Sequence, residues 1–358
     1  MKLIIVTQKV DKEDENLGAF YYWFDMLAGR VDELVIIADS VGSTQFPKNV
    51  TICELGKQKG YSSYRRLLRL WEFFWKHYRE SDIVLFHQIP EHVIATAPFL
   101  LLWKKKTALW YAHKSVTTRL KIAEKLVDYI FSSSEAGFRL PSKKVFFVGQ
   151  AINTELFRPP ARNAFAEKSF RLITIGRIAP VKNYEIIIKA CAILKETWNQ
   201  PWSFSIVGGP IFPRDQEYLA ALKKLVEEKG LGSQVHFYGS KPYSEVPHIL
   251  EEHDCFINVS ATGSLDKAVF EAMAEGLTVI TSNEAYRSLL PSQYFLEHTS
   301  PAFLAERIKT LVGEARPNMS LRAIVLEHHS LEKTVDHIFR VLTEEKYALR
   351  KEIKPSSI

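Results

Sequence analysis

Short apolar runs alternate with amphipathic stretches along the chain of 358 residues. This alternation is typical of parallel β-sheets whose strands are joined by crossover helices. In the first half, apolar runs predict strands at 2–8, 33–39, 50–55, 82–88, 108–114, 129–134 and 145–150. Helical spacing of apolar residues between those runs predicts helices at 17–29, 62–80, 91–103 and 116–126.

The stretch 153–169 interrupts this alternation with prolines and mixed polarity, so we expect a linker between two domains there. A second series then predicts strands at 171–177, 203–209, 235–240, 255–260 and 277–282. Its helices are expected at 183–196, 214–230, 244–252 and 266–275. Because a single core rarely grows beyond about 250 to 300 residues, the chain length also favours two domains. The predicted class is α/β, with two doubly wound, Rossmann-like parallel sheets.

Residues 330–351 have the pattern of one long helix, with Ser330 as N-cap and Glu332 in the first turn. We expect this helix to cross back and pack toward the first domain. The predicted organisation is a first domain at 1–157, a second at 165–328 and a C-terminal helical segment at 329–358. Ligands of open parallel sheets bind beyond the carboxyl ends of the strands, so we expect a site in a central cleft that the two sheets face.

The net charge of +6 lies in the first half of the chain and concentrates between residues 57 and 125. Within this basic region, 64–80 interleaves Arg and Lys with Leu, Trp and Phe at helical spacing. One interpretation is a solvated helix face. The other is a basic amphipathic surface that rests on anionic lipid headgroups. Nucleic acid is not expected as a partner, because no nucleic-acid-binding motif accompanies the basic residues.

Several classes of protein are disfavoured. Cys53, Cys191 and Cys255 are far apart and form no CxxC pair, which indicates reduced thiols in a cytoplasmic protein and no zinc site. The apolar start of the chain is too short for a signal peptide. The longest nearly apolar segment, 93–103, is about half of the ~20 residues that a membrane-spanning helix needs. Neither a dinucleotide-binding glycine fingerprint nor a P-loop is present.

Two cations follow the strand that ends at Gly176. Arg177 and Lys182 flank a strand-to-helix turn, where a guanidinium fork and an ammonium can converge on a diphosphate. The free amides of the following helix would add to that attraction. The alternative is that both are ordinary loop charges. The pair Gly208 and Gly209 also ends a strand, and it permits a close backbone approach or a plain turn.

The stretch 261–276 places Lys267 in the first turn of a predicted helix, where a cation is mildly unfavourable. An anion between Lys267 and the helix end would remove that cost. One turn later, Glu271 lies among apolar residues and would need a partner, either ribose hydroxyls or Lys267 itself. A plain i,i+4 ion pair is the alternative. His87 and His113 each end a predicted strand and are equally compatible with a structural or a functional role.

Four phrases carry a family resemblance: VGQAINTELFRP (148–159), GRIAPVKN (176–183), IVGGP (206–210) and FYGSKPYSEVPHILEEHDCFINVS (237–260). Together with FEAMAEG they resemble the retaining glycosyltransferases of the GT-B fold, specifically the group 1 or GT4 family. The resemblance is strongest from about residue 145 to residue 285 and is coarse elsewhere.

The resemblance implies roles for individual residues. Arg177 and Lys182 match the diphosphate-binding positions, His113 matches a histidine beside the donor sugar, and Glu271 matches the second Glu of an E-x7-E motif that binds ribose. The first Glu of that motif is replaced by Gly263, and we hypothesise that Asp266 substitutes for it. The expected substrate-binding residues are Gly18, which is a loose match to a glycine-rich turn, and Gly209, Lys241, Gly263, Ser264, Leu265, Asp266 and Lys267.

The resemblance also implies a reaction. A sugar would pass from a UDP-, GDP- or ADP-sugar to an acceptor hydroxyl with retention at the anomeric carbon, without a metal or another cofactor. The basic first half favours a glycan or lipid-linked acceptor in cell-envelope glycan, lipopolysaccharide or glycolipid synthesis, on the inner face of a membrane. The rival hypotheses are a sugar-nucleotide-binding protein with little or no catalysis and a sugar-nucleotide 2-epimerase.

Overall fold

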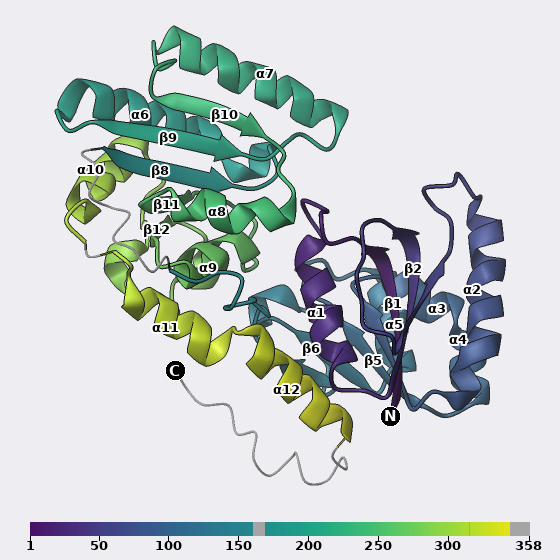
Figure 1. Ribbon diagram of the computed structural model, residues 1–358. Coiled ribbons are helices and arrows are strands. Elements are labelled where there is room, and N and C mark those ends of the chain that lie inside the picture. Colours follow the sequence, from purple (N-terminus) through teal and green to yellow (C-terminus); the bar gives the residue numbers. More distant parts are fainter. Residues whose placement is uncertain (160–168, 315, 344–358) are drawn as a thin grey trace. The chain divides into compact units, whose positions relative to one another are not determined.

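The computed structural model describes residues 1–159, 169–314 and 316–343. It divides the chain into two compact units. The first comprises Met1–Ala151 and the chain from Leu331 onward, and the second comprises Ile152–Ser330. Each unit is built around a parallel sheet flanked by helices (Figure 1). The predicted α/β class is therefore confirmed.

The first unit contains a 7-stranded sheet in the order β3-β2-β1-β4-β5-β6-β7. The central strand β1 pairs in parallel with β2 on one side and with β4 on the other. The strands are β1 Lys2–Val10, β2 Glu33–Val41, β3 Val50–Glu54, β4 Ile83–His87, β5 Lys106–Trp110, β6 Tyr129–Ser132 and β7 Val145–Phe147. All of these elements were predicted, with their ends shifted by a few residues.

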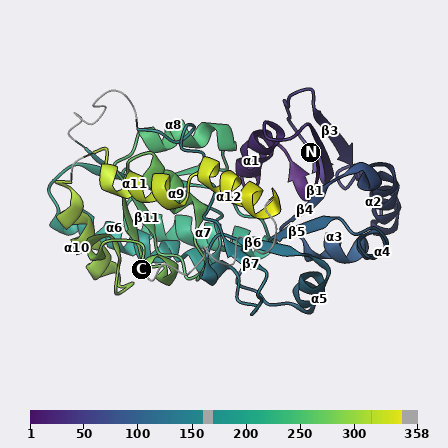
Figure 2. The same cartoon turned by 90° about the horizontal axis from the view of Figure 1, so that it is seen from below.

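Helices cover both faces of this sheet. Alternation along β1 sends Leu3 and Ile5 into one core and Ile4 and Val6 into the other, because successive strand side chains point to opposite faces. The first core is shared with α1 and α12, which contact each other (Figure 2). The helices are α1 Gly18–Ala28, α2 Ser63–His77, α3 Pro90–Ala95, α4 Ala97–Leu102, α5 Thr118–Leu126 and α12 Leu331–Thr343.

The second unit contains a 5-stranded parallel sheet in the order β10-β9-β8-β11-β12. Its strands are β8 Phe170–Ile175, β9 Trp202–Val207, β10 Val235–Gly239, β11 Cys255–Asn258 and β12 Thr278–Thr281. Its helices are α6 Tyr184–Thr197, α7 Pro213–Glu228, α8 Val246–Glu251, α9 Lys267–Ala274, α10 Pro301–Leu311 and α11 Met319–His328. The strand order reverses direction at β8, which is the usual position for a ligand in such a sheet.

The structure differs from the expected elements in three places. The helix predicted at 91–103 is broken into α3 and α4, because Pro98 has no N–H to continue the hydrogen-bond ladder. Helices α10 and α11 were not predicted, although Ser300 and Asn318 cap them through their side chains. The predicted C-terminal helix is present as far as Thr343, and its remaining residues lie outside the described part of the chain.

The first unit ends at Ala151 rather than at residue 157. Ile152 forms a β-bridge with Ser330, and the Phe157 ring packs edge-on against Tyr243, 5.8 Å between ring centroids. These contacts hold 152–157 in the second unit. Within the described residues, no helix is both long and apolar enough to cross a membrane.

Candidate functional site

Backbone from two strand ends meets closely in the second unit. Gly176, directly after β8, donates its N–H to Val207 O at 2.9 Å, and Ile178 donates to Gly209 O at 3.0 Å. A Cβ on Gly208 would lie 2.0 Å from Gly176 O, and Gly208 has a φ of +136°. The predicted close approach is therefore present, and it requires glycine at position 208.

The turn between β8 and α6 is fixed at several points. Asn183 adopts a left-handed conformation, with φ 52° and ψ 41°, and its Nδ2 donates to Val259 O at 2.9 Å. Val181 O accepts a hydrogen bond from Ala261 N at 3.0 Å. Tyr184 donates its hydroxyl to Gly176 O at 3.0 Å. These bonds hold the turn that carries Arg177 and Lys182 against the segment that follows β11.

Lys182 forms an ion pair across this junction. Its Nζ lies 2.9 Å from Asp266 Oδ1, and both side chains are largely buried. Asp266 Oδ2 accepts from Asn258 Nδ2 at 2.9 Å, and Tyr286 donates its hydroxyl to the Asp266 carbonyl at 2.6 Å. Asp266 thus positions the Lys182 ammonium at the carboxyl edge of the sheet and balances its charge.

Arg177 leaves the same turn beside an aromatic side chain. Its guanidinium lies over the Phe212 ring, 5.6 Å from the ring centroid, which is within the range of a cation–π contact. Phe212 directly precedes α7, so the contact links the β8 turn with the β9 turn. The structure places Arg177 and Lys182 in one strand-to-helix turn, as the sequence pattern indicated.

Lys267 and Glu271 form the first and second turns of α9. Glu271 is 5% exposed and accepts a hydrogen bond from the Tyr243 hydroxyl at 2.8 Å. Burial raises the pKa of Glu271, against the opposing effects of the Lys267 charge and of Tyr243. Burial likewise lowers the pKa of Lys267 to about 8, although the Glu271 charge favours the protonated form. Lys267 is half-buried, so it is not a fully exposed surface lysine.

The loop before α9 is a tight turn. Gly263 has a φ of +65°, in the left-handed region where a glutamate would be strained. Ser264 O accepts from Asn283 Nδ2 at 2.8 Å, and Leu265 is buried. The backbone conformation thus gives a physical reason for the glycine at the position of the first motif glutamate.

The remaining predicted residues have local roles in each unit. Gly18 begins α1 and donates its N–H to Asp14 O at 2.9 Å. Lys241 Nζ lies 3.5 Å from Glu245 Oε2, as a surface i,i+4 pair. No relation of either residue to a substrate is visible from these contacts.

The two strand-end histidines differ. His113 is exposed, and its Nδ1 accepts from Ser115 N at 3.1 Å. His87 is buried, with Nδ1 3.0 Å from Thr7 Oγ1 and its ring edge-on to Phe20. His87 is therefore a core residue of the first unit, whereas His113 is accessible for a functional role.

The sequence analysis did not identify the polar residues whose hydrogen bonds hold the second-unit site together. Asn183 is recognisable only as the last residue before a helix, and the others give no local signal, since most of their partners are far away in the sequence. These residues are Asn183, Tyr184, Tyr243, Asn258, Asn283 and Tyr286. In the described ranges, no group of three or more His, Cys, Asp or Glu side chains could hold a metal ion.

Solved structures similar to this chain support the fold over nearly its whole length. Anabaena Alr3699/HepE in complex with UDP-glucose has a TM-score of 0.74 at 15% identity, covering 96% of this chain and 99% of that one. Sucrose-phosphate synthase from Thermosynechococcus elongatus has a TM-score of 0.72 at 14% identity, covering 95% and 98%. These neighbours and the two parallel-sheet units define the GT-B fold class.

Residues 158–315 match the family model of the glycosyl transferases group 1. The amylovoran biosynthesis glycosyltransferase AmsK of Erwinia amylovora is 29% identical over 171 residues, which are 46% of this chain and 39% of that protein. The putative colanic acid biosynthesis glycosyltransferase WcaL of Escherichia coli K12 is 28% identical over 148 residues, 40% and 34% respectively. The chain thus matches well under half the length of these curated relatives. The residues that match the group 1 model lie in the second unit and include Arg177, Lys182, Asp266, Lys267 and Glu271.

Proposed function

We propose that this protein is a retaining glycosyltransferase that moves a sugar from a nucleoside-diphosphate sugar to an acceptor hydroxyl. The observation that carries the proposal is the half-buried Lys182 ammonium, held by Asp266 beyond β8, in a segment that matches the group 1 model. Among UDP-, GDP- and ADP-sugars, a UDP-sugar is the first candidate, because the HepE structure contains UDP-glucose.

Charge stabilisation is the main contribution of the site. When the glycosidic bond to the diphosphate breaks, negative charge develops on the leaving oxygens. Arg177 and Lys182 stabilise that charge, and Lys267 with the first amides of α9 adds to it. Protein cations can provide the charge neutralisation that a divalent ion provides elsewhere, so we propose a metal-independent reaction.

The other predicted residues position the substrates. Glu271, with Tyr243 hydrogen-bonded to it, accepts hydrogen bonds from the ribose hydroxyls. His113 lies beside the donor sugar, and the acceptor hydroxyl attacks on the face from which the diphosphate leaves. The leaving phosphate takes the proton of that hydroxyl, which accounts for retention without a protein nucleophile.

We propose a glycan or lipid-linked acceptor in cell-envelope glycan, lipopolysaccharide or glycolipid synthesis, reached by peripheral association with the inner face of a membrane. The exposed side of α2 supports membrane association, because it carries apolar side chains beside Arg65 and Lys76. These exposed side chains are Tyr64, Leu68, Trp71 and Trp75. Flotation with anionic vesicles at low salt tests this part: binding that Trp75→Ala reduces is expected, and no binding of the intact protein would contradict it.

A donor screen tests the reaction. UDP-, GDP- and ADP-sugars are added in the presence of EDTA, and thermal shift is followed by an assay for released nucleotide. One donor class should stabilise the protein and release nucleotide when a suitable acceptor is present. Stabilisation without release across many acceptors would favour the rival hypothesis of a sugar-nucleotide-binding protein.

A further inference from the structure

The first unit contains a cavity of about 880 Å³ beyond the carboxyl ends of its central strands. Gln8, Asp39, Leu55 and Ile89 line it from the chain near the ends of β1 to β4, and α2 forms one wall. This volume is within the usual range for a small-molecule site, roughly 300 to 1,000 Å³. The cavity belongs to the first unit alone and is separate from the residues around Lys182.

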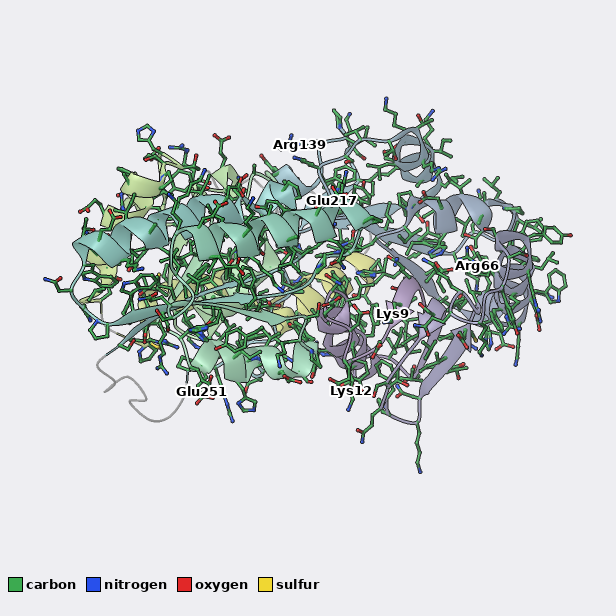
Figure 3. All side chains as sticks on the ribbon, turned by 90° about the horizontal axis from the view of Figure 1, so that it is seen from above. Lys9, Lys12, Arg66, Arg139, Glu217 and Glu251 are labelled. Carbon is green, nitrogen blue, oxygen red and sulfur yellow. The ribbon has the colours of Figure 1, made fainter. Side chains whose placement is uncertain are left out.

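One end of the cavity is polar. Asp39 is buried, with Oδ1 2.9 Å from Arg66 Nη1 and Oδ2 3.4 Å from His92 Nε2. Figure 3 shows Arg66 in the first unit. The Arg66 Nε is buried and has no hydrogen-bond partner among the described residues. Asp39 therefore holds the Arg66 guanidinium in place, while the Nε–H of Arg66 remains unsatisfied.

Positive charge prevails among the charged residues that line the cavity. Lys57, Arg66 and Arg119 contribute cations, whereas Asp39 and Glu91 contribute carboxylates. Arg119 Nη1 lies 2.5 Å from Glu91 Oε1, and both side chains are well exposed, so this surface pair can exchange for another anion at low cost. The polar end thus suits an anion with several oxygen acceptors, such as a phosphate.

Much of the remaining lining is apolar. Leu67, Leu70 and Trp71 line it from α2, and Ile94 and Pro98 line it from the α3 and α4 segment. The Trp71 Nε1 donates to Ala95 O at 2.8 Å, so the only polar atom of the indole is satisfied. A free phosphate would leave this wall without apolar contacts.

The apolar wall is next to an apolar exterior. Trp71 lines the cavity and is also 39% exposed, and it lies on the same helix side as Leu68 and Trp75. Leu101 and Leu102 are exposed on α4, which lies beside α2 (Figures 1 and 2). An apolar chain that leaves the cavity past Trp71 would therefore remain in contact with apolar surface.

We propose that this cavity binds a lipid phosphate, with the phosphate at Lys57, Arg66 and Arg119 and the first part of the apolar chain along Leu67 and Trp71. This inference rests on the proposed function, because the lipid phosphate would be the anchor of the glycosyl acceptor. The bound lipid would hold the acceptor at the carboxyl edge of the first sheet and connect it with the membrane.

Farnesyl phosphate is a suitable probe, titrated below its aggregation concentration into the intact protein without vesicles. Trp71→Ala and Arg66→Gln should each weaken its binding about tenfold or more. Phe147→Ala and Arg65→Gln change exposed residues of the first unit that do not line the cavity, and they should leave the affinity within about twofold. UDP binding depends on the second unit and should persist in all four variants, and an unchanged far-ultraviolet circular dichroism spectrum would show that the first unit is folded.

Two further probes separate the sources of affinity. Farnesol carries the chain without the phosphate, and inorganic phosphate carries the anion without the chain. Both should bind at least about tenfold more weakly than farnesyl phosphate. Equal binding of inorganic phosphate would indicate a free-phosphate site, and equal binding of farnesol a plain apolar cavity. Either result would overturn the inference and leave the proposed donor site intact. The same holds for an equal effect of Phe147→Ala and Trp71→Ala, and for no binding of farnesyl phosphate while UDP still binds.

Discussion

The Lys182 ammonium lies 2.9 Å from the Asp266 carboxylate, although the two residues are 84 positions apart in the sequence. Lys182 comes from the turn after β8, and Asp266 directly precedes α9. Asn258 and Thr262 also contact the carboxylate, at 2.9 and 3.5 Å. Both carboxylate oxygens therefore have protein partners. We infer that Asp266 positions Lys182 for the diphosphate, rather than substituting for the missing sugar-binding glutamate.

Asp266→Asn should tighten the binding of UDP several-fold, because the carboxylate and the diphosphate compete for the same ammonium. Turnover should fall, since Lys182 loses the partner that orients it. Isothermal titration and a steady-state assay measure the two effects. In the Lys182→Ala background the same change should leave UDP affinity unaltered, because coupled residues are not additive. A loss of affinity for UDP-sugar but not for UDP in Asp266→Asn would instead indicate a sugar contact.

Binding of UDP-glucose at pH 8 should take up protons. The pKa of Lys267 is about 8 in the ligand-free protein, so the lysine is only partly protonated at that pH. A diphosphate beside the ammonium favours the charged form and raises this pKa, which requires net proton uptake on binding. Calorimetry in two buffers of different ionisation enthalpy measures the number of protons.

The uptake should vanish at pH 6, where Lys267 is already protonated, and in Lys267→Met. Lys241→Met serves as a control, because that lysine forms only a surface pair with Glu245. Equal proton uptake in the wild type and in Lys267→Met would show that Lys267 is not a neighbour of the diphosphate.

Glu271→Gln should weaken donor binding by about tenfold, roughly 1.4 kcal/mol, because ribose hydroxyls lose a charged acceptor. Tyr243→Phe should have a smaller effect, since it removes the hydroxyl that orients the carboxylate but leaves the carboxylate itself. Competition binding with UDP and uracil reports the loss, and only the ribose-containing ligand should respond. Glu284→Gln changes an exposed acid and should have no effect.

Gly208→Ala should disrupt the junction between the β8 and β9 turns. The added Cβ would lie 2.0 Å from Gly176 O, and the positive φ adds strain. We expect a lower free energy of unfolding, by about 1 to 3 kcal/mol, together with weaker UDP binding. Gly232→Ala is the matched control, because nothing lies within 4 Å of its added Cβ. Chemical denaturation should separate the two variants, and identical curves would contradict this account of the junction.

The sheets could be predicted from the sequence because buried parallel strands form continuous apolar runs. Both strand series emerged from these runs, and β1 differs from its predicted end by only two residues. The break between α3 and α4 depends on Pro98, whose effect within an apolar stretch was underestimated. Helices α10 and α11 have N-caps at Ser300 and Asn318, and these capping residues are recognisable in the sequence.

The site was only partly predictable. Arg177, Lys182 and Glu271 stand in phrases that resemble the group 1 family, and their expected roles follow from that resemblance. The partners of Lys182 and Glu271 could not be predicted from local sequence, because Asp266 and Tyr243 contact them only in the folded unit. The reason for Gly263 could not be predicted from the sequence either. Its backbone is left-handed, with a φ of +65°, and this conformation explains the glycine.

The most direct test of the donor site is calorimetric titration of UDP in the presence of EDTA into the wild type, Lys182→Ala and Lys189→Ala. Lys189 is an exposed residue on α6, and its replacement by alanine controls for the loss of a positive charge. We predict saturable binding to the wild type and Lys189→Ala, and binding at least about tenfold weaker to Lys182→Ala. Equal affinity in all three proteins would contradict the assignment of Lys182 to the diphosphate.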